Sequence, residues 1–324
     1  IDGNAQTTNP TIAASSYTAI RTMDAADTQG VLAFIVSGIK DNAGNASSNN
    51  TATNDATSVT FDSVVPTLTG LTIAASADFD NDNATSLAKS GDVVTITFYT
   101  DAPVQTPTAS IAGETATVTG STASWTAAKT MDDDDADGVI AFTVDFSDLA
   151  GNAGTQQTAV ITGINATYDK TAPTINTAVI ASSNATNTLA TVDDVVSVSL
   201  TSNEDLYSLT NVTIAGQTVD ASDISNTNAT TWSFQYTMAI SDADGAVAFT
   251  FTANDLAGNG TTVTTATSGS VMFDKTLPTL PTVEISSNNA NTSYAKSANV
   301  VTLTISSDED LIGAPTVLLA GRTA

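Results

Sequence analysis

The stretch "ADGVIAFTVDFSDLAGN", from Ala136 to Asn152, decides the fold class. Its centre alternates apolar and polar residues and places Ile140, Phe142 and Val144 on one face, as in a strand with one buried side. It ends in Asp-Leu-Ala-Gly-Asn, where Gly and Asn readily adopt the left-handed backbone of a tight turn. An alternating strand that runs into a polar turn predicts an all-β protein.

The same landmarks recur with a period of about 107 residues. Asp-x-Ala-Gly-Asn begins at Asp41, Asp148 and Asp255, and a boundary phrase reads FDSVVPT at 61–67, YDKTAPT at 168–174 and FDKTLPT at 273–279. This period suits a sandwich domain and is too long for a solenoid repeat. It predicts the C-terminal part of a repeat at 1–64, complete repeats at 65–170 and 171–275, and the N-terminal part of a further repeat at 276–324. We expect the chain to be a window on a longer array.

Within the first complete repeat, short alternating segments predict seven strands separated by turns. They are expected at 68–74, 93–100, 124–131, 139–146 and 158–168, with a further pair across a turn at Gly113. Seven strands in about a hundred residues favour a Greek-key β-sandwich. Trp125, Trp232, Phe34, Phe142 and Phe249 recur in step with the repeat and are expected in the core.

The composition excludes several classes of chemistry and of binding partner. The chain has 324 residues, a net charge of −26, and neither Cys nor His, which removes thiol and imidazole chemistry. The charge argues against nucleic acid or an anionic membrane as a partner and favours hard cations such as Ca²⁺. No apolar run reaches the roughly 18 residues that a membrane span needs.

These motifs resemble bacterial immunoglobulin-like repeats, which fill giant secreted adhesins and surface-layer proteins. The resemblance rests on "ADGVIAFTVDFSDLAGN", the boundary phrase "DKTAPT" and the period, and it covers essentially the whole chain. It implies tandem immunoglobulin-like sandwiches in a linear array. It also implies a secreted, cell-surface stalk or lattice role, with Ca²⁺ often stiffening the junctions between domains.

The acidic residues gather where this topology would place the junctions. Loops after the first, third and fifth strands lie at one end of such a sandwich, and loops after the second, fourth and sixth lie at the other. The acidic loops 78–83 and 132–138 therefore face the next repeat, whose own 203–205 and 255–259 face back. Oxygen ligands at alternate positions of a turn suit Ca²⁺. The candidate metal ligands are Asp27, Asp62, Asp78, Asp80, Asp82, Asp133, Asp135, Asp137, Asp148, Asp169, Glu204, Asp205, Asp242, Asp255 and Asp274.

Plain turn geometry is the competing interpretation of these acids, because Asp and Gly are common turn residues that need no metal. An enzyme is not expected, since the acids repeat with the domain whereas a catalytic site usually occurs once. The sequence favours a non-catalytic, calcium-rigidified stalk of a large cell-surface adhesin. The alternatives are a lattice or filament subunit and a glycan- or protein-binding module.

The expected partners are neighbouring repeats of the same longer chain. Other copies in a filament or lattice, and a surface glycan or protein ligand, are further candidates. Lys89, Lys129 and Lys170 are expected at loops or polar edges, so a covalent Lys–Asn cross-link is not expected.

Overall fold

The computed structural model describes residues 16–76 and 86–323. Nearly every regular element in these ranges is a β-strand, and the exception is one short 3₁₀ helix, η1 (Ala221–Asp223). Within the same ranges no helix is both long enough and apolar enough to cross a membrane. The chain divides into two compact units, residues 1–173 with 254–260, and residues 174–253 with 261–324, and each is described separately.

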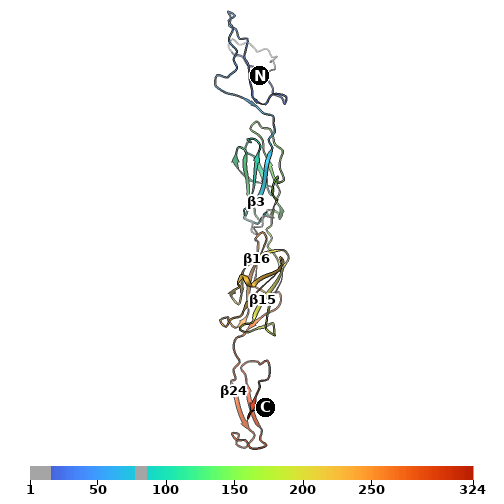
Figure 1. The fold of residues 1–324 in the computed structure, drawn as a ribbon, viewed down its shortest axis with the longest axis vertical. Coiled ribbons are helices and arrows are strands. Elements are labelled where there is room, and N and C mark those ends of the chain that lie inside the picture. Colours follow the sequence, from blue (N-terminus) through green and yellow to red (C-terminus); the bar gives the residue numbers. More distant parts are fainter. Residues whose placement is uncertain (1–15, 77–85, 324) are drawn as a thin grey trace. The chain divides into compact units, whose positions relative to one another are not determined.

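The first complete sandwich begins with a four-stranded antiparallel sheet (Figure 1). The strand order is β3 (Leu68–Ala75), β5 (Val93–Thr100), β9 (Ser124–Thr130) and β8 (Thr117–Ser121). Alternating side chains point to opposite faces of the sheet. Val94, Ile96 and Phe98 on β5 are fully buried, and Tyr99, the next residue along the strand, is exposed. This face of the sheet forms one wall of the core.

The opposite wall consists of two three-stranded sheets. One is ordered β11 (Phe142–Asp145), β6 (Thr108–Ile111), β7 (Glu114–Thr115), and the other β10 (Gly138–Val139), β12 (Ala166–Tyr168), β4 (Ser86–Ala88). Strand β4 runs parallel to β12, and the other pairs are antiparallel. The strand order is that of an immunoglobulin-like Greek-key sandwich.

Three of the predicted strand segments differ from the observed ones. The segment expected at 158–168 forms a strand only at Ala166–Tyr168 (β12). The strand expected at 139–146 is divided into β10 and β11, because Ile140 bonds to the Ala166 carbonyl and Ala141 accepts a bond from Ala112, so the two halves join different sheets. The pair expected across Gly113 is also shorter, since β7 pairs with β6 but β8 pairs with β9 in the other sheet. A chain that changes sheet between adjacent residues leaves no signal in a period-two pattern.

The second complete sandwich repeats this plan. Its sheets are ordered β13-β15-β19-β18, β17-β16-β21-β22 and β14-β23-β20. Their bounds are Ile175–Ser182 (β13), Leu189–Ala190 (β14), Val195–Ser202 (β15), Leu206–Ile214 (β16), Gln217–Thr218 (β17), Ile224–Asn228 (β18), Thr231–Thr237 (β19), Gly245–Ala246 (β20), Phe249–Asp255 (β21), Gly260–Val263 (β22) and Met272–Phe273 (β23).

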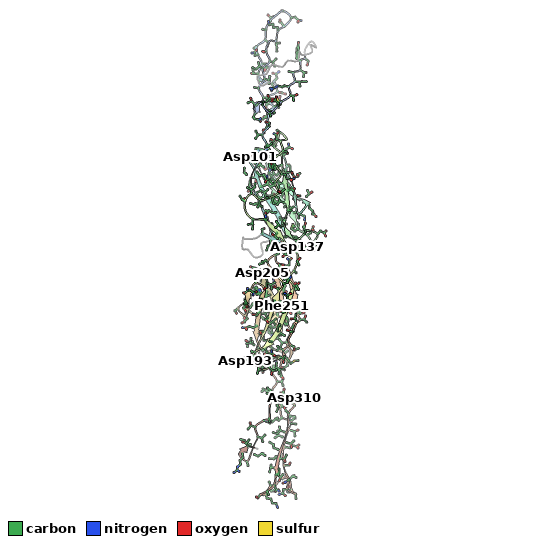
Figure 2. All side chains as sticks on the ribbon, turned by 90° about the vertical axis from the view of Figure 1, so that its right-hand side faces the viewer. Asp101, Asp137, Asp193, Asp205, Phe251 and Asp310 are labelled. Atoms are coloured by element: carbon green, nitrogen blue, oxygen red, sulfur yellow. The ribbon has the colours of Figure 1, made fainter. Side chains whose placement is uncertain are left out.

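Each complete sandwich has its own hydrophobic core. One core cluster runs from Leu71 to Tyr168 and the other from Ala178 to Phe273. The expected core aromatics Trp125, Phe142 and Phe249 are buried, and Trp232 is half-buried against its cluster. In each sandwich the labelled loop acids mark opposite ends: Asp101 and Asp137 in the first, Asp205 and Asp193 in the second (Figure 2).

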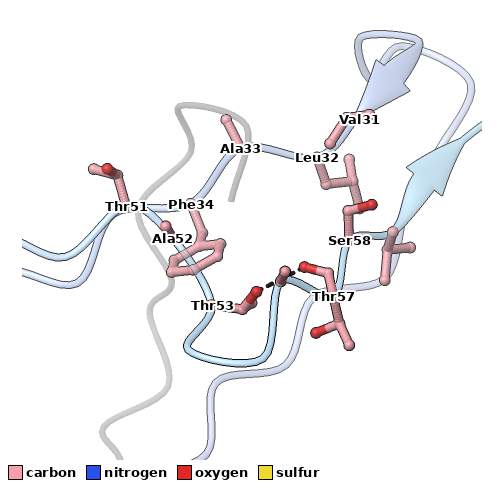
Figure 3. Close-up of a pocket in the computed structure, with 11 residues that line it drawn as sticks. Val31, Leu32, Ala33, Phe34, Thr51, Ala52, Thr53, Thr57 and Ser58 are labelled. Atoms are coloured by element: carbon pink, nitrogen blue, oxygen red, sulfur yellow. Dashed lines mark hydrogen bonds between the residues drawn. The ribbon is translucent and has the colours of Figure 1, made fainter.

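The flanking segments carry fewer strands. Residues 16–64 hold β1 (Gly30–Val31) paired with β2 (Thr60–Phe61). Residues 276–323 hold β24 (Thr282–Ser287) paired with β25 (Val301–Ser306), and β26 (Leu318–Leu319) paired with β27 (Arg322–Thr323). Each segment contains a hollow, and the mainly apolar one in residues 16–64 is drawn in Figure 3.

Candidate metal centre

The aspartates three residues before the repeated glycines, Asp27, Asp135 and Asp242, are here called the loop aspartates. Each is buried, and each accepts a hydrogen bond at Oδ2 from the backbone N–H three residues earlier, at 2.8–2.9 Å. A carboxylate that caps its own turn in this way fixes the loop that leads into the next strand. This contact gives all three loop aspartates a structural role within their own repeats.

Each loop aspartate also faces a side-chain donor six residues earlier. Arg21 meets Asp27, Lys129 meets Asp135 with an Nζ–Oδ2 distance of 2.6 Å, and Tyr236 meets Asp242 through its hydroxyl at 3.4 Å. Burial opposes the charge of Lys129, but the hydrogen bond and charge of Asp135 outweigh burial and raise the pKa of Lys129. A bond to Lys129 leaves the Asp135 carboxylate less available to a metal ion.

The expectation that Lys129 lies at a polar edge is therefore wrong. Its side chain is only 6% exposed, because it points inward from β9 in register with Trp125 and Ala127. Glu114 lies 3.5 Å from the same Nζ. The ammonium group is tolerated inside the sandwich because both acids compensate its charge.

The residue before each repeated glycine holds the linker that leads to the next repeat. Asp137 accepts bonds from the Lys170 backbone N–H (2.9 Å) and the Thr171 hydroxyl (3.0 Å). The same arrangement recurs at Asp244 with Lys275 and Thr276, and at Gln29 with Ser63. We call this contact between the residue before the glycine and the linker the clamp. An amide fills the position as well as a carboxylate does, so the clamp depends on hydrogen bonding and not on negative charge.

The aspartates that open the Asp-x-Ala-Gly-Asn turns, here the turn aspartates, are held by the Asn four residues on. Asp148 accepts the Asn152 backbone N–H at 2.8 Å and its side-chain amide at 2.7 Å, while Gly151 adopts a φ of 96°. Burial opposes ionisation of Asp148, but the bonds from Asn152 outweigh burial and lower its pKa. Asp255 and Asn259 make the same two bonds.

The same Asn binds the linker, which the sequence did not indicate. Asn152 donates to the Asp62 backbone carbonyl and Asn259 to the Asp169 carbonyl, each at 3.0 Å. The separation is 90 residues in both cases. In the sequence, the one sign of this contact is the constant number of residues between the linker and the turn. That number does not identify the atoms that bond. We call this contact the linker latch.

The linker aspartates, Asp62, Asp169 and Asp274, each accept the backbone N–H two residues on, at 2.9 Å. Burial, followed by the charges of Asp255 and Asp137, raises the pKa of Asp169. Asp169 and Asp255 belong to the same compact unit, and the negative charge of Asp255 disfavours ionisation of Asp169.

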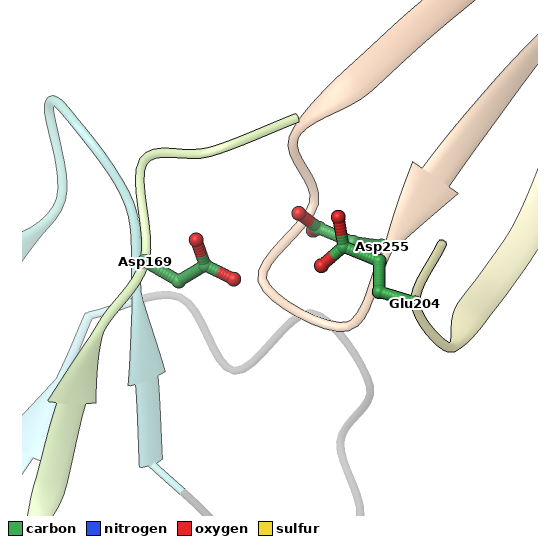
Figure 4. Close-up of side chains that lie close together, drawn as sticks. All are labelled: Asp169, Glu204 and Asp255. Atoms are coloured by element: carbon green, nitrogen blue, oxygen red, sulfur yellow. The ribbon is translucent and has the colours of Figure 1, made fainter. Parts of the chain in front are cut away.

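Figure 4 draws three of the predicted ligands, Asp169, Glu204 and Asp255. Asp169 and Asp255 belong to the first compact unit and Glu204 to the second. Asp255 is buried and the other two are half-buried. Carboxylate oxygens are suitable ligands for a hard cation, which takes six to eight oxygens when it is Ca²⁺.

A related pair, Asp274 and Glu309, lies in the second compact unit. Burial, then the charges of Asp274 and Asp308, raises the pKa of Glu309, and its Oε1 is buried without a hydrogen-bond partner. Glu309 and Glu204 occupy equivalent positions, because each follows a residue that binds the linker. Asp308 accepts the backbone N–H of Thr279, and Asn203 accepts that of Thr174. Glu309 is not among the predicted ligands, although "SDED" at 307–310 differs from "SNED" at 202–205 at one position only.

The corresponding place in the first compact unit is a hollow of about 170 Å³ lined by Asp62, Asp101 and Asp148. Ala102 stands there at the position of Glu204, so this set lacks one carboxylate. The Asp101 carboxylate binds the Thr67 backbone N–H and hydroxyl, and the hydroxyl bond in particular lowers the pKa of Asp101. The acid content of the site therefore differs between repeats.

The other predicted ligands are dispersed. Asp133 and Asp205 are exposed, and the Lys170 ammonium lies among the loop carbonyls, 2.6 Å from that of Asp133 and 2.7 Å from that of Asp135. The lysine thus supplies a positive charge at the centre of the acidic loop. Asp78, Asp80 and Asp82 lie outside the described residues.

No protein-family model and no curated protein matches the chain. Solved structures are similar in part. The I9-I11 tandem from titin is 12% identical over 59% of this chain and 64% of that one, with a TM-score of 0.31. The full ectodomain (Ig1-Ig3) of mouse nectin-like molecule 4 is 11% identical over 66% and 67%, with a TM-score of 0.25.

A third structure is SGBP-B of the Bacteroides ovatus mixed-linkage glucan utilization locus, in complex with a mixed-linkage heptasaccharide. It is 16% identical over 83% of this chain and 61% of that one, with a TM-score of 0.18. The chain thus spans just under two thirds of the titin tandem and of SGBP-B. At these identities and scores the similarity does not bear on function.

Proposed function

We propose that this chain is a non-catalytic structural repeat region of an extracellular protein, a stalk segment of a large cell-surface adhesin stiffened by Ca²⁺. The observation that carries the proposal is the repeated fastening of the linkers. The linker latch holds Asp62 and Asp169 through Asn152 and Asn259, and the clamp before each glycine holds the residues that follow. Fastening that recurs with the repeat supports load transmission along the chain.

The distribution of the acids supports a non-catalytic role. The loop aspartates and turn aspartates are engaged by their own turns in each repeat. A catalytic pair is expected once, in a cleft, with two environments that separate its pKa values. Carboxylates that recur with the domain fit a structural purpose better.

Calcium is proposed at the linker aspartates, with Asp169 and Asp255 as the central pair and Glu204 as a further candidate ligand. Their like charges repel each other, and a divalent cation bound between them would reverse the sign of that interaction. Glu309 beside Asp274 supplies a second candidate position with an unpartnered buried oxygen. At ten times its Kd, one ion adds about 1.4 kcal/mol to the folded state. The larger consequence is a stiffer linker.

The test compares thermal unfolding and small-angle scattering of the 324-residue chain in Ca²⁺ and in chelator. Ca²⁺ should raise the melting temperature and sharpen the distance distribution. Asp169→Asn is the informative variant, because it removes the repulsion with Asp255 but also a ligand. It should melt at or above the parent in chelator and below the parent in Ca²⁺.

Asp145→Asn is the matched control, since Asp145 is exposed on the sandwich and its carboxylate accepts hydrogen bonds from the Gln156 amide. It should respond to Ca²⁺ as the parent does. If melting and scattering are the same in Ca²⁺ and chelator, the calcium part of the proposal fails. Binding of the chain to a glycan array would instead favour the binding-module alternative, and a regular array on the native cell surface would favour the lattice.

A further inference from the structure

One segment distinguishes the second complete sandwich from the first. Trp232 lies 16 residues after Gly216, whereas Trp125 lies 12 residues after Gly113. Part of the longer segment forms the 3₁₀ helix η1, which directly precedes β18 at the edge of the sheet β13-β15-β19-β18. The insertion therefore adds side chains at a sheet edge where the first sandwich has none.

A small hollow lies where η1 meets the outer face of this sheet, and it measures about 110 Å³. Phe234 borders the hollow, but its side chain is 1% exposed and belongs to the core. The other lining residues come from β15, η1, β18 and β19, and all of them are polar: Ser197, Ser222, Asp223, Ser225, Ser233 and Gln235. The accessible groups are therefore hydroxyls, one amide and one carboxylate.

Strand register places these polar groups side by side. Ser197 pairs with Gln235 and Ser225 pairs with Ser233, so all four side chains point to the outer face. The hydroxyl oxygens of Ser225 and Ser233 are 3.0 Å apart, and the Gln235 amide donates to the Asp223 carboxylate at 3.3 Å. These bonds hold the lining in place before a ligand arrives, which lowers the entropy cost of binding.

The first sandwich has only part of this arrangement. Thr119 and Thr126 form the equivalent hydroxyl pair, with their oxygens 2.8 Å apart. Ala128 stands at the position of the amide and Thr117 at that of the carboxylate. Of the two complete sandwiches, only the second therefore combines hydroxyls with an amide and a carboxylate on this face.

The chemistry of the lining suits a neutral ligand that is rich in hydroxyl groups. A carboxylate only accepts hydrogen bonds, an amide donates and accepts, and a hydroxyl does both, which matches adjacent hydroxyls on a sugar ring. No cationic side chain lines the hollow, and the chain carries a net charge of −26, so an acidic ligand is disfavoured. A single carboxylate also offers Ca²⁺ little charge compensation.

We propose that this hollow binds one sugar unit of a neutral oligosaccharide. Asp223 accepts hydrogen bonds from two adjacent sugar hydroxyls, and Gln235 and the serines complete the contact. The hollow is well below the roughly 300–1,000 Å³ of pockets for drug-sized ligands, so it encloses no more than one unit. The inference goes beyond the stalk role and uses none of the linker contacts.

The experiment measures binding of the 324-residue chain to a panel of defined neutral and acidic oligosaccharides. The chain is displayed at high density on beads, so that weak contacts add. The parent should bind a neutral oligosaccharide in preference to the acidic ones. Asp223→Ala should weaken that binding about tenfold or more, because hydrogen bonds to a charged group are lost, and Ser225→Ala should weaken it several-fold.

Two matched substitutions serve as controls. Asp220→Ala removes an exposed carboxylate beside η1 that does not line the hollow, and Thr119→Ala removes the equivalent hydroxyl pair of the first sandwich. Both variants should bind like the parent. Neither Asp223 nor Ser225 belongs to the core, so the melting temperature of both test variants should stay at that of the parent.

A parent chain that binds no oligosaccharide of the panel overturns the inference. Equal binding by Asp223→Ala and Asp220→Ala places the contact elsewhere on the chain and overturns it too, and a preference for acidic oligosaccharides contradicts the neutral ligand. Binding that Asp223→Ala abolishes assigns the sugar to one repeat. Since the calcium response is measured by melting and scattering, either proposal can fail without the other.

Discussion

At the scale of the residue, positions that change identity between repeats reveal what each position does. The donor facing the loop aspartate is Arg21, Lys129 or Tyr236. Two of these are cations and one is neutral, so the position requires a hydrogen-bond donor that reaches a buried carboxylate. A position reserved for binding a metal would instead need an oxygen ligand in every repeat.

The side-chain amide of Asn152 donates two hydrogen bonds, one to the Asp148 carboxylate and one to the Asp62 carbonyl. Asn152→Ala removes both donors and leaves the 3%-exposed Asp148 carboxylate short of a partner. An unsatisfied buried acceptor costs about 1–3 kcal/mol, more when it is charged. We expect the first complete repeat to lose stability by that amount in urea unfolding.

The control for this substitution is Asn45→Ala in the turn that begins at Asp41. That turn makes the same internal bonds, but Asp41 and Asn45 are exposed. Water replaces the lost bonds there, and a change within about 0.5 kcal/mol is expected. Equal losses for the two variants would show that the turn matters and that the linker latch does not.

At the scale of the element, strand β5 is the case in which the sequence alone was sufficient to predict both the extent of a strand and its buried face. The range 93–100 was predicted and found, with Val94, Ile96 and Phe98 fully buried. A strand in the middle of a sheet with one buried face obeys a strict period of two, so pattern alone fixes both its extent and its orientation.

The candidate site was less predictable, because its parts meet through contacts between distant residues. Topology placed Asp169 and Asp255 at the same junction, but gave no sign that Lys129 bonds to Asp135. Lys129 did share the inward register of Trp125, and this signal was overlooked because a buried lysine is rare. Glu309 was missed although its tetrapeptide repeats that of Glu204.

The inward register of β9 makes Lys129 a sensitive position. Lys129→Met keeps the length of the side chain but leaves Asp135, 5% exposed, without its cation. Removing one partner of a buried ion pair costs about 3–5 kcal/mol. We expect a loss of this size in the unfolding free energy of the first complete repeat, measured by urea titration at neutral pH.

Two further substitutions separate the ion pair from general packing. Lys129→Arg should largely retain stability, because Arg21 faces Asp27 at the equivalent position. Lys89→Met, which breaks a more exposed pair with Asp92, should cost no more than about 1 kcal/mol. If Lys129→Met is no worse than Lys89→Met, the buried pair does not stabilise the sandwich.

At the scale of the whole molecule, the period in the sequence corresponds to separate hydrophobic cores. The cluster from Leu71 to Tyr168 and the cluster from Ala178 to Phe273 share no residue. Domains with separate cores unfold as separate cooperative units unless their interface is large. The calorimetric trace of the chain should therefore contain two transitions for the complete repeats.

Val94 and Val196 allow a matched test of this independence. Both are fully buried at the same position of the same strand, one in each cluster. Val→Ala at either position removes two methyl groups and leaves a cavity, at a cost of about 2 kcal/mol. For a domain of about 100 residues this lowers the melting temperature by roughly 10 °C. Val94→Ala should shift one calorimetric transition and Val196→Ala the other, whereas a common shift of both by either variant would mean that the repeats unfold as one unit.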